Sequence, residues 1–236
     1  MEEPAQGTRE NEWYTPKWGP RRFRLLVGMT FVPYTLMNAS YTVIGCFAAP
    51  STNLYRAGLL ALVYLLAVGI SAHALDATAP NRPWGAFLTR NQLFALGFGS
   101  LLLAAGVGLY LALAFAPFLL LVGVLEIFLL LAYNLELFKG RFHTDLWFSF
   151  SWGFLPVVAG YVLQTDSFAP IGLAAGIFGF ATAYVEISAS RPYKEAKRTV
   201  VAGGSPYAKK FESILKGIVL SVVAVALSLV LLRTLN

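Results

Sequence analysis

Charged residues are scarce in this sequence of 236 residues. Only 13% are Asp, Glu, Lys or Arg, whereas a soluble domain carries about 25%, and 57% of the residues are hydrophobic. Such a chain lacks the polar side chains needed to cover its own surface, which excludes a soluble globular enzyme, a disordered protein and a nucleic-acid-binding protein. Its single cysteine, Cys46, excludes an internal disulfide and a cysteine-based zinc site. The composition therefore predicts an integral membrane protein.

Long apolar runs predict an all-α, polytopic membrane protein, because a membrane-spanning helix needs about 20 apolar residues. Residues 91–125 form an uncharged segment that is too long for one span. We place the break between Ala116 and Pro117, because proline favours the first turn of a helix. The pair Arg191 and Pro192 predicts the end of a later helix. About seven spans are expected, at residues 25–49, 57–75, 93–116, 117–135, 146–163, 168–185 and 211–232.

The first 24 residues differ from the rest of the chain. Residues 1–24 are polar and contain no apolar core of the kind that a cleavable signal peptide needs. Trp13, Tyr14 and Trp18 precede the basic residues Arg21 and Arg22, a combination typical of an anchor at the membrane interface. We therefore expect a cytoplasmic tail and interfacial anchor at residues 1–24 and a single transmembrane helical domain at residues 25–236.

The distribution of basic residues predicts the orientation. If the N-terminus is cytoplasmic, only Arg56 and Arg233 fall on the external side, so the positive-inside rule places the N-terminus inside and the C-terminus outside. The same rule accounts for the net charge of +6, and no nucleic-acid partner is expected. Most of the remaining polar chemistry then lies at the cytoplasmic face.

Three groups of polar residues stand at predicted cytoplasmic helix ends. His73 and Asp76 share a helix face and would bind a metal ion or exchange a proton, or else are ordinary polar residues at a helix end. Lys139 and Arg141 would bind an anionic headgroup or a diphosphate, or else reflect only topology and lipid contact. The groups are His73, Asp76 and Arg82; Asn134, Lys139, Arg141 and His143; and Tyr184, Glu186, Arg191 and Lys194.

One acidic residue falls inside a predicted span. Glu126 lies near the middle of residues 117–135, where an ionised carboxylate costs on the order of 2.5–3.5 kcal/mol on insertion scales. Its side chain is therefore expected to face the interior of the bundle and to be protonated or hydrogen-bonded. Two interpretations stay open: a contact to a proton or a substrate, and a structural hydrogen bond to a Tyr or Ser on another helix.

The order of these features resembles the UbiA superfamily of intramembrane prenyltransferases. The second span runs into Gly-Ile-Ser-Ala-His-Ala-Leu-Asp, and the fourth runs into Tyr-Asn-Leu-Glu-Leu-Phe-Lys-Gly-Arg-Phe. The resemblance extends from about Leu25 to Val200. The segments that carry it are residues 69–76, 81–85, 133–142, 147–161, 183–186 and 197–200.

The resemblance implies a helical bundle around a central cavity that opens to lipid, and transfer of a polyprenyl group from its diphosphate to a lipophilic or aromatic acceptor. Two acidic motifs in this family hold Mg²⁺ at the diphosphate, and the matching residues here are Asp76 and Glu186. The chain departs from the family pattern: His73 stands in place of an Asn, Pro80 in place of an acid, and each motif keeps one carboxylate where the family has more.

Three functions follow from this resemblance. As a prenyltransferase, the protein would use Asp76 with His73 in catalysis, and Asn134 or His143 to orient the acceptor. Diphosphate contacts would come from basic side chains, with Tyr184 beside them: Arg82, Lys139, Arg141, Arg191 and Lys194. Alternatively the protein binds an isoprenoid, quinone or other lipid without catalysis, or rearranges an isoprenoid as a cyclase does, with Glu126, His73 and Asp76 as acids or bases. The expected partners are a prenyl diphosphate or another isoprenoid lipid, and membrane lipids.

Overall fold

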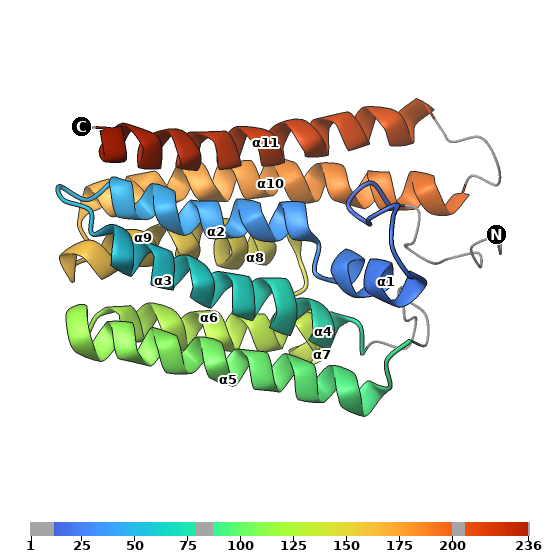
Figure 1. Ribbon diagram of the computed structural model, residues 1–236, viewed down its shortest axis with the longest axis horizontal. Helices are drawn as coiled ribbons and strands as arrows, with labels where there is room; N and C mark the ends of the chain where they lie inside the picture. The colour runs from blue at the N-terminus through green and yellow to red at the C-terminus, as the bar shows by residue number, and fades with distance from the viewer. Residues whose placement is uncertain (1–11, 79–86, 200–205, 236) are drawn as a thin grey trace.

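The computed structural model describes residues 12–78, 87–199 and 206–235, and every regular element in these ranges is a helix (Figure 1). Most helices lie along one common direction, with α10 and α11 on one side of the molecule and α5 and α6 on the other. Two π-helical segments, Leu65–Ala72 and Phe150–Phe154, continue α3 into α4 and α8 into α9. The α-helices are α1 (Arg21–Met29), α2 (Val32–Phe47), α3 (Leu54–Tyr64), α4 (His73–Asp76), α5 (Arg90–Phe115), α6 (Leu119–Asn134), α7 (Leu137–Gly140), α8 (Asp145–Ser149), α9 (Leu155–Thr165), α10 (Pro170–Thr199) and α11 (Pro206–Leu235).

The protein is a multi-pass membrane protein by the length and composition of its helices. Within the described ranges, five helical runs are long and apolar enough to cross a bilayer. The two other predicted spans have a different form. Residues 25–49 are divided between α1 and α2, and α6 is apolar but has only 16 residues. The five runs are Leu54–Asp76, Arg90–Phe115, Asp145–Thr165, Pro170–Lys197 and Tyr207–Leu235.

Three prolines affect the helices differently. α5 ends at Phe115 and α6 begins at Leu119, so the predicted break at Pro117 is confirmed. Near Pro33 the chain breaks at Phe31, whose φ of 46° is left-handed, and Pro33 occupies the first turn of α2, where its missing N–H is not needed. The predicted helix end at Pro192 is wrong, because α10 continues through this residue to Thr199. Proline removes one helical hydrogen bond, but α10 also packs against α8, α9 and α11, and this packing competes with the local preference for a helix end.

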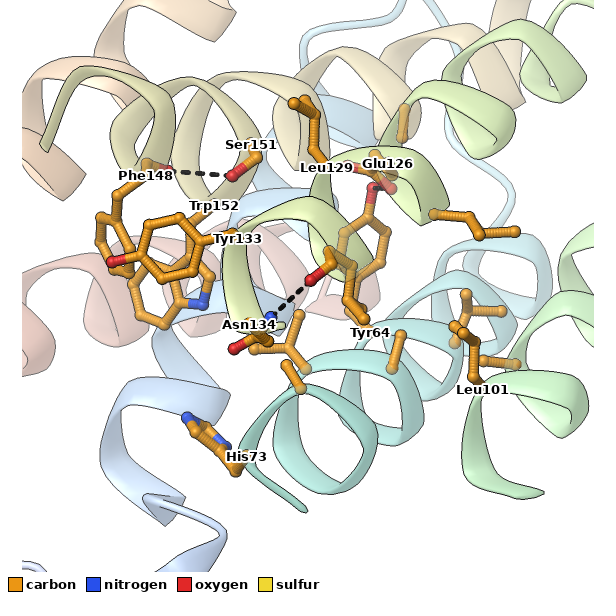
Figure 2. A pocket seen from close by; sticks show the side chains of 18 of the residues that line it. Tyr64, His73, Leu101, Glu126, Leu129, Tyr133, Asn134, Phe148, Ser151 and Trp152 are labelled. Atoms are coloured by element: carbon orange, nitrogen blue, oxygen red, sulfur yellow. Dashed lines mark hydrogen bonds between the residues drawn. The ribbon is translucent and has the colours of Figure 1, made fainter. Parts of the chain in front are cut away.

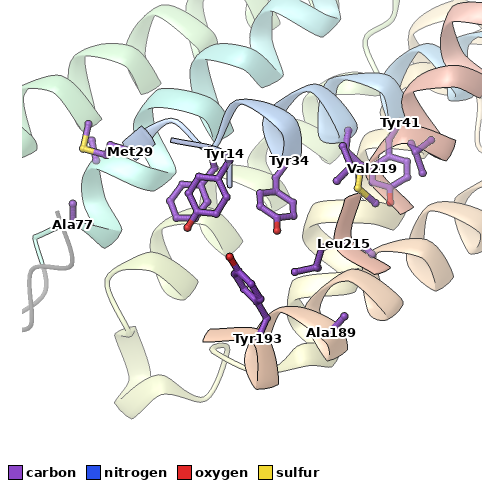
Figure 3. Close-up of a cluster of buried hydrophobic side chains, with 14 of the residues drawn as sticks. Tyr14, Met29, Tyr34, Tyr41, Ala77, Ala189, Tyr193, Leu215 and Val219 are labelled. Carbon is purple, nitrogen blue, oxygen red and sulfur yellow. The ribbon is translucent and has the colours of Figure 1, made fainter. Parts of the chain in front are cut away.

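The described part of the N-terminal tail packs into the helical core. Tyr14 stacks on Phe31 with ring centroids 4.8 Å apart and meets the edge of Tyr34 at 5.7 Å. Figure 3 shows Tyr14, Tyr34 and Tyr193 facing one another, and the Tyr193 hydroxyl donates a hydrogen bond to Glu12 Oε2 at 2.5 Å. Residues 12–14 thus pack with the helices, and their interfacial role remains a prediction.

Glycines bring the central helices into backbone contact. A Cβ built on Gly45 of α2 would lie 1.9 Å from the Val157 carbonyl oxygen of α9, and one on Gly160 of α9 would lie 2.1 Å from the Thr42 carbonyl oxygen. A Cβ built on Gly153, in the π-helical segment, would lie 2.2 Å from the Gly179 carbonyl oxygen of α10. Small residues allow this approach, which lets helices associate in lipid by close packing.

We expect Gly160→Ala to destabilise the protein by about 1–3 kcal/mol, because its methyl group has no room against α2. The matched control is Gly106→Ala, where a Cβ meets nothing within 4 Å and where stability stays equal or rises, since glycine weakens a helix. Thermal unfolding in detergent measures both. Equal melting temperatures for the two variants would contradict the backbone contact.

The predicted orientation has a direct test because Cys46, the only cysteine, is buried. Ser51→Cys places an exposed thiol in the α2–α3 connection, and Tyr207→Cys places one at the start of α11, at the opposite end of the bundle (Figure 1). With the N-terminus inside, a membrane-impermeant maleimide added to intact cells should label Ser51→Cys and leave Tyr207→Cys unlabelled. The opposite pattern would reverse the assigned orientation.

Candidate functional site: a cavity with a polar rim

A cavity of about 950 Å³ lies inside the bundle. Its walls come from α3 and the π-helical segment after it, from α5, α6 and α10, and from the region around α4 and α8. A volume near the upper end of the usual range for ligand pockets suits a long apolar ligand. The cavity is lined along α6 from Leu119 to Asn134, a length of about 22 Å at 1.5 Å per residue.

Eight of the residues predicted from the sequence line this one cavity, although they come from four separate segments. They are His73, Asp76, Glu126, Asn134, His143, Glu186, Arg191 and Lys194. The helices bring together the end of α4, the end of α6, the segment before α8 and the later part of α10. These polar residues, apart from Glu126, form what we call the rim.

Three other predicted residues lie elsewhere. The chain bends after α6 through left-handed residues, among them Phe138 and Lys139, and Lys139 is exposed. Arg141 lies in a second, smaller pocket of about 410 Å³ among aromatic side chains. Tyr184 is 46% exposed and stacks on Phe180 of its own helix. None of the three lines the cavity, and Arg82 lies outside the described residues.

The rim holds charges of both signs. Glu186 is 4% exposed, and its Oε2 atom has no hydrogen-bond partner among the described residues. Arg191 donates a hydrogen bond from Nε to Asp145 Oδ1, which fixes the guanidinium group between α10 and α8. Lys194 follows Glu186 two turns later on α10 and also lines the cavity. The rim can thus bind an anionic group through its basic side chains and a cation through its carboxylates.

The two histidines of the rim are held by aromatic rings. His73 stacks on Phe31 with centroids 4.5 Å apart, and its Nδ1 lies 3.3 Å from the Gly69 carbonyl oxygen. His143 stacks on Tyr133 at 4.3 Å, with Nδ1 3.2 Å from the Tyr133 carbonyl oxygen. Fixed rings of this kind can orient a substrate or take up a proton.

A short π-helical segment precedes His73 and Asp76 directly. Residues Leu65–Ala72 widen the helix before α4, and Phe150–Phe154, which include the cavity-lining residues Ser151 and Trp152, do the same after α8. π-Helical turns inside α-helices are frequent at functional sites. His73 and Asp76 thus directly follow a π-helical segment whose residues Ala67, Val68 and Ala72 also line the cavity.

A polar contact in the cavity wall joins α3 to α6. The Tyr64 hydroxyl donates a hydrogen bond to Glu126 Oε2 at 2.5 Å, and both residues line the cavity (Figure 2). This is the structural hydrogen bond to a Tyr of another helix that was one of the two interpretations of Glu126. The sequence gives no signal for Tyr64 other than the need of Glu126 for a partner.

The rim carries few of the ligands that Mg²⁺ needs. Among the described residues no group of three or more His, Cys, Asp or Glu side chains forms a metal cluster. Mg²⁺ usually keeps several waters and binds through one or two carboxylates plus substrate phosphates. Asp76 and Glu186 both line the cavity, and the unpartnered Oε2 of Glu186 is a suitable ligand atom, so the residues fit an ion held jointly with a phosphate.

Comparison with known proteins adds no assignment: the chain matches no protein-family model, and no curated protein or solved structure matches it.

Filling the cavity from its wall tests whether lipid occupies it. Gly108 of α5 lines the cavity and has open space at its Cβ position, so Gly108→Phe should reduce the amount of co-purified lipid several-fold while the fold is kept. Gly106→Phe is the matched control, because Gly106 is an exposed residue of the same helix that does not line the cavity. Native mass spectrometry after mild extraction measures the bound lipid. Equal lipid content in the two variants would show that lipid does not occupy the cavity.

Proposed function

We propose that the protein is a membrane prenyltransferase that takes a prenyl group from a prenyl diphosphate and transfers it to a lipophilic or aromatic acceptor. The observation that carries this proposal is the convergence of Asp76, Glu186, Arg191 and Lys194 at the rim of one largely apolar cavity. An isoprenoid chain would lie along α6 and its diphosphate at the rim. The order of sequence features, which resembles the UbiA superfamily, supports the same reading.

Each rim residue has a role in this reaction. Asp76 and Glu186 would hold Mg²⁺, which when bound neutralises charge on the diphosphate. Arg191 and Lys194 would donate hydrogen bonds to phosphate oxygens, and Asp145 keeps the Arg191 guanidinium in place. Arg191 is half exposed, so these contacts would act at the opening of the cavity, next to the solvent.

The transfer breaks one bond, forms one bond and releases one proton, and a residue of the rim can accept that proton. The bond between the prenyl C1 and the diphosphate oxygen breaks, and its electron pair leaves with the diphosphate. A nucleophilic atom of the acceptor forms the new bond to C1 and gives up a proton. Asn134 and His143 would orient the acceptor, and His73 would accept the proton.

A second candidate function is binding or carriage of an isoprenoid, quinone or other lipid without catalysis. Its specific support is that the described residues hold no group of three or more metal-binding side chains, so any ion would depend on the phosphate for further ligands. The cavity itself serves both functions equally well. Consumption of a prenyl diphosphate separates them.

The test is Mg²⁺-dependent release of diphosphate from geranylgeranyl diphosphate by purified protein in nanodiscs supplied with a phenolic acceptor. Asp76→Asn and Glu186→Gln should each lower the rate about 100-fold or more, because each removes one of the two carboxylates that hold the ion. Glu136→Gln is the matched control, since Glu136 is exposed, does not line the cavity and should keep the wild-type rate. If the wild-type protein releases no diphosphate but retains a neutral isoprenoid in native mass spectrometry, the binding function replaces the catalytic one.

A further inference from the structure

Only one of the two carboxyl oxygens of Glu126 has a hydrogen-bond partner among the described residues. Tyr64 is 4% exposed and donates its hydroxyl proton to Glu126 Oε2. The other carboxyl oxygen, Oε1, is buried and has no hydrogen-bond partner among the described residues. Because a buried polar atom without a partner destabilises a protein, a purely structural role leaves Oε1 unexplained.

The pair lies well away from the rim. Glu126 precedes Asn134 by eight residues of α6, which corresponds to about 12 Å along the helix. Figure 2 shows Tyr64 pointing to Glu126, with His73 and Asn134 on the other side of the view. The nearby cavity walls are aliphatic, and the two basic side chains that line the cavity among the described residues, Arg191 and Lys194, both belong to the rim.

We infer that Tyr64 and Glu126 form a second binding site, deep in the cavity, for the hydroxyl group of an uncharged lipophilic ligand such as a polyprenyl alcohol or a phenol. The unpartnered Oε1 and the lone pairs of the Tyr64 oxygen are the groups that would meet it. The inference shares its cavity with the proposed function, but it does not require diphosphate cleavage.

A hydroxyl group is the chemistry that fits this site best. It donates to Oε1 when the carboxyl group is ionised and accepts from it when the carboxyl group is protonated, whereas an ether or carbonyl oxygen only accepts. A second charged group at this depth would have no aqueous screening and no basic partner from the rim. The site therefore selects a neutral donor.

The experiment compares two probes that differ by one hydrogen-bond donor, geranylgeraniol and its methyl ether. Native mass spectrometry of protein released from nanodiscs measures the ratio of alcohol to ether retained from an equimolar mixture. We expect about tenfold preference for the alcohol, the ratio that one net hydrogen bond of typical strength gives. Glu126→Leu should abolish the preference, and Tyr64→Phe should lower it.

Controls separate this site from the rim. Tyr133→Phe removes another tyrosine hydroxyl from the cavity wall and should keep the preference, as should Asp76→Asn even if it abolishes diphosphate release. Glu126→Gln keeps a carbonyl oxygen and should retain part of the preference, so it decides the outcome if Glu126→Leu does not fold. Equal retention of alcohol and ether by the wild type, or an unchanged preference in the Glu126 variants, would overturn the inference.

Discussion

The architecture depends on backbone-to-backbone contact at a few glycines. In lipid, helices gain little from hiding apolar surface from one another, so close packing has to supply the association energy. Gly45 and Gly160 bring α2 against α9, and Gly153 and Gly179 bring the π-helical segment before α9 against α10. These contacts hold α2, α9 and α10 as one tightly packed unit. The orientation of α10, and with it the position of Glu186 and Arg191, follows from this unit.

The cavity exists because the other helices do not make such contacts throughout. Gly108 of α5 and Gly123 of α6 both face open space and line the cavity, so here glycine leaves room for a ligand in place of a neighbouring helix. Polar side chains within membrane spans are stable only where they face protein or a cavity. Glu126 and Glu186 both meet this condition, because both line the same cavity.

Much of the fold follows from hydropathy, and the exceptions have physical causes. The helical class, the break at Pro117 and the five long runs are set by apolar length and by proline, which the sequence displays directly. The break at Phe31 and the continuation of α10 through Pro192 depend on tertiary packing, which overrides local preference. In the same way, glycine content alone does not distinguish Gly160, in backbone contact, from Gly106, in open space.

Some residues of the candidate site could be predicted from the sequence, and others could not. Residues at the ends of predicted spans, such as Asp76 and Asn134, reach the cavity as their positions predict. Lys139 and Arg141 do not line the cavity, because left-handed residues after α6 turn the chain away from it. Glu136 and Phe138 adopt this left-handed conformation, which their residue types do not predict. Tyr64 could not be paired with Glu126 from the sequence, since that pairing depends on the rotation of two helices far apart in the chain.

The depth of each polar group decides the kind of recognition it can provide. At the rim, opposite charges such as Arg191 and Asp145 neutralise one another, and their remaining donors suit a charged phosphate group. About 12 Å further along α6, the Tyr64 and Glu126 pair is surrounded by aliphatic side chains, where only neutral partners are accommodated at low free energy. A pure hydrocarbon would leave both polar regions unsatisfied. The two proposals are therefore compatible: an amphipathic occupant, charged at one end and apolar along its length, would fill the rim and the apolar wall, and a hydroxyl-bearing molecule or group would reach the Tyr64 and Glu126 pair.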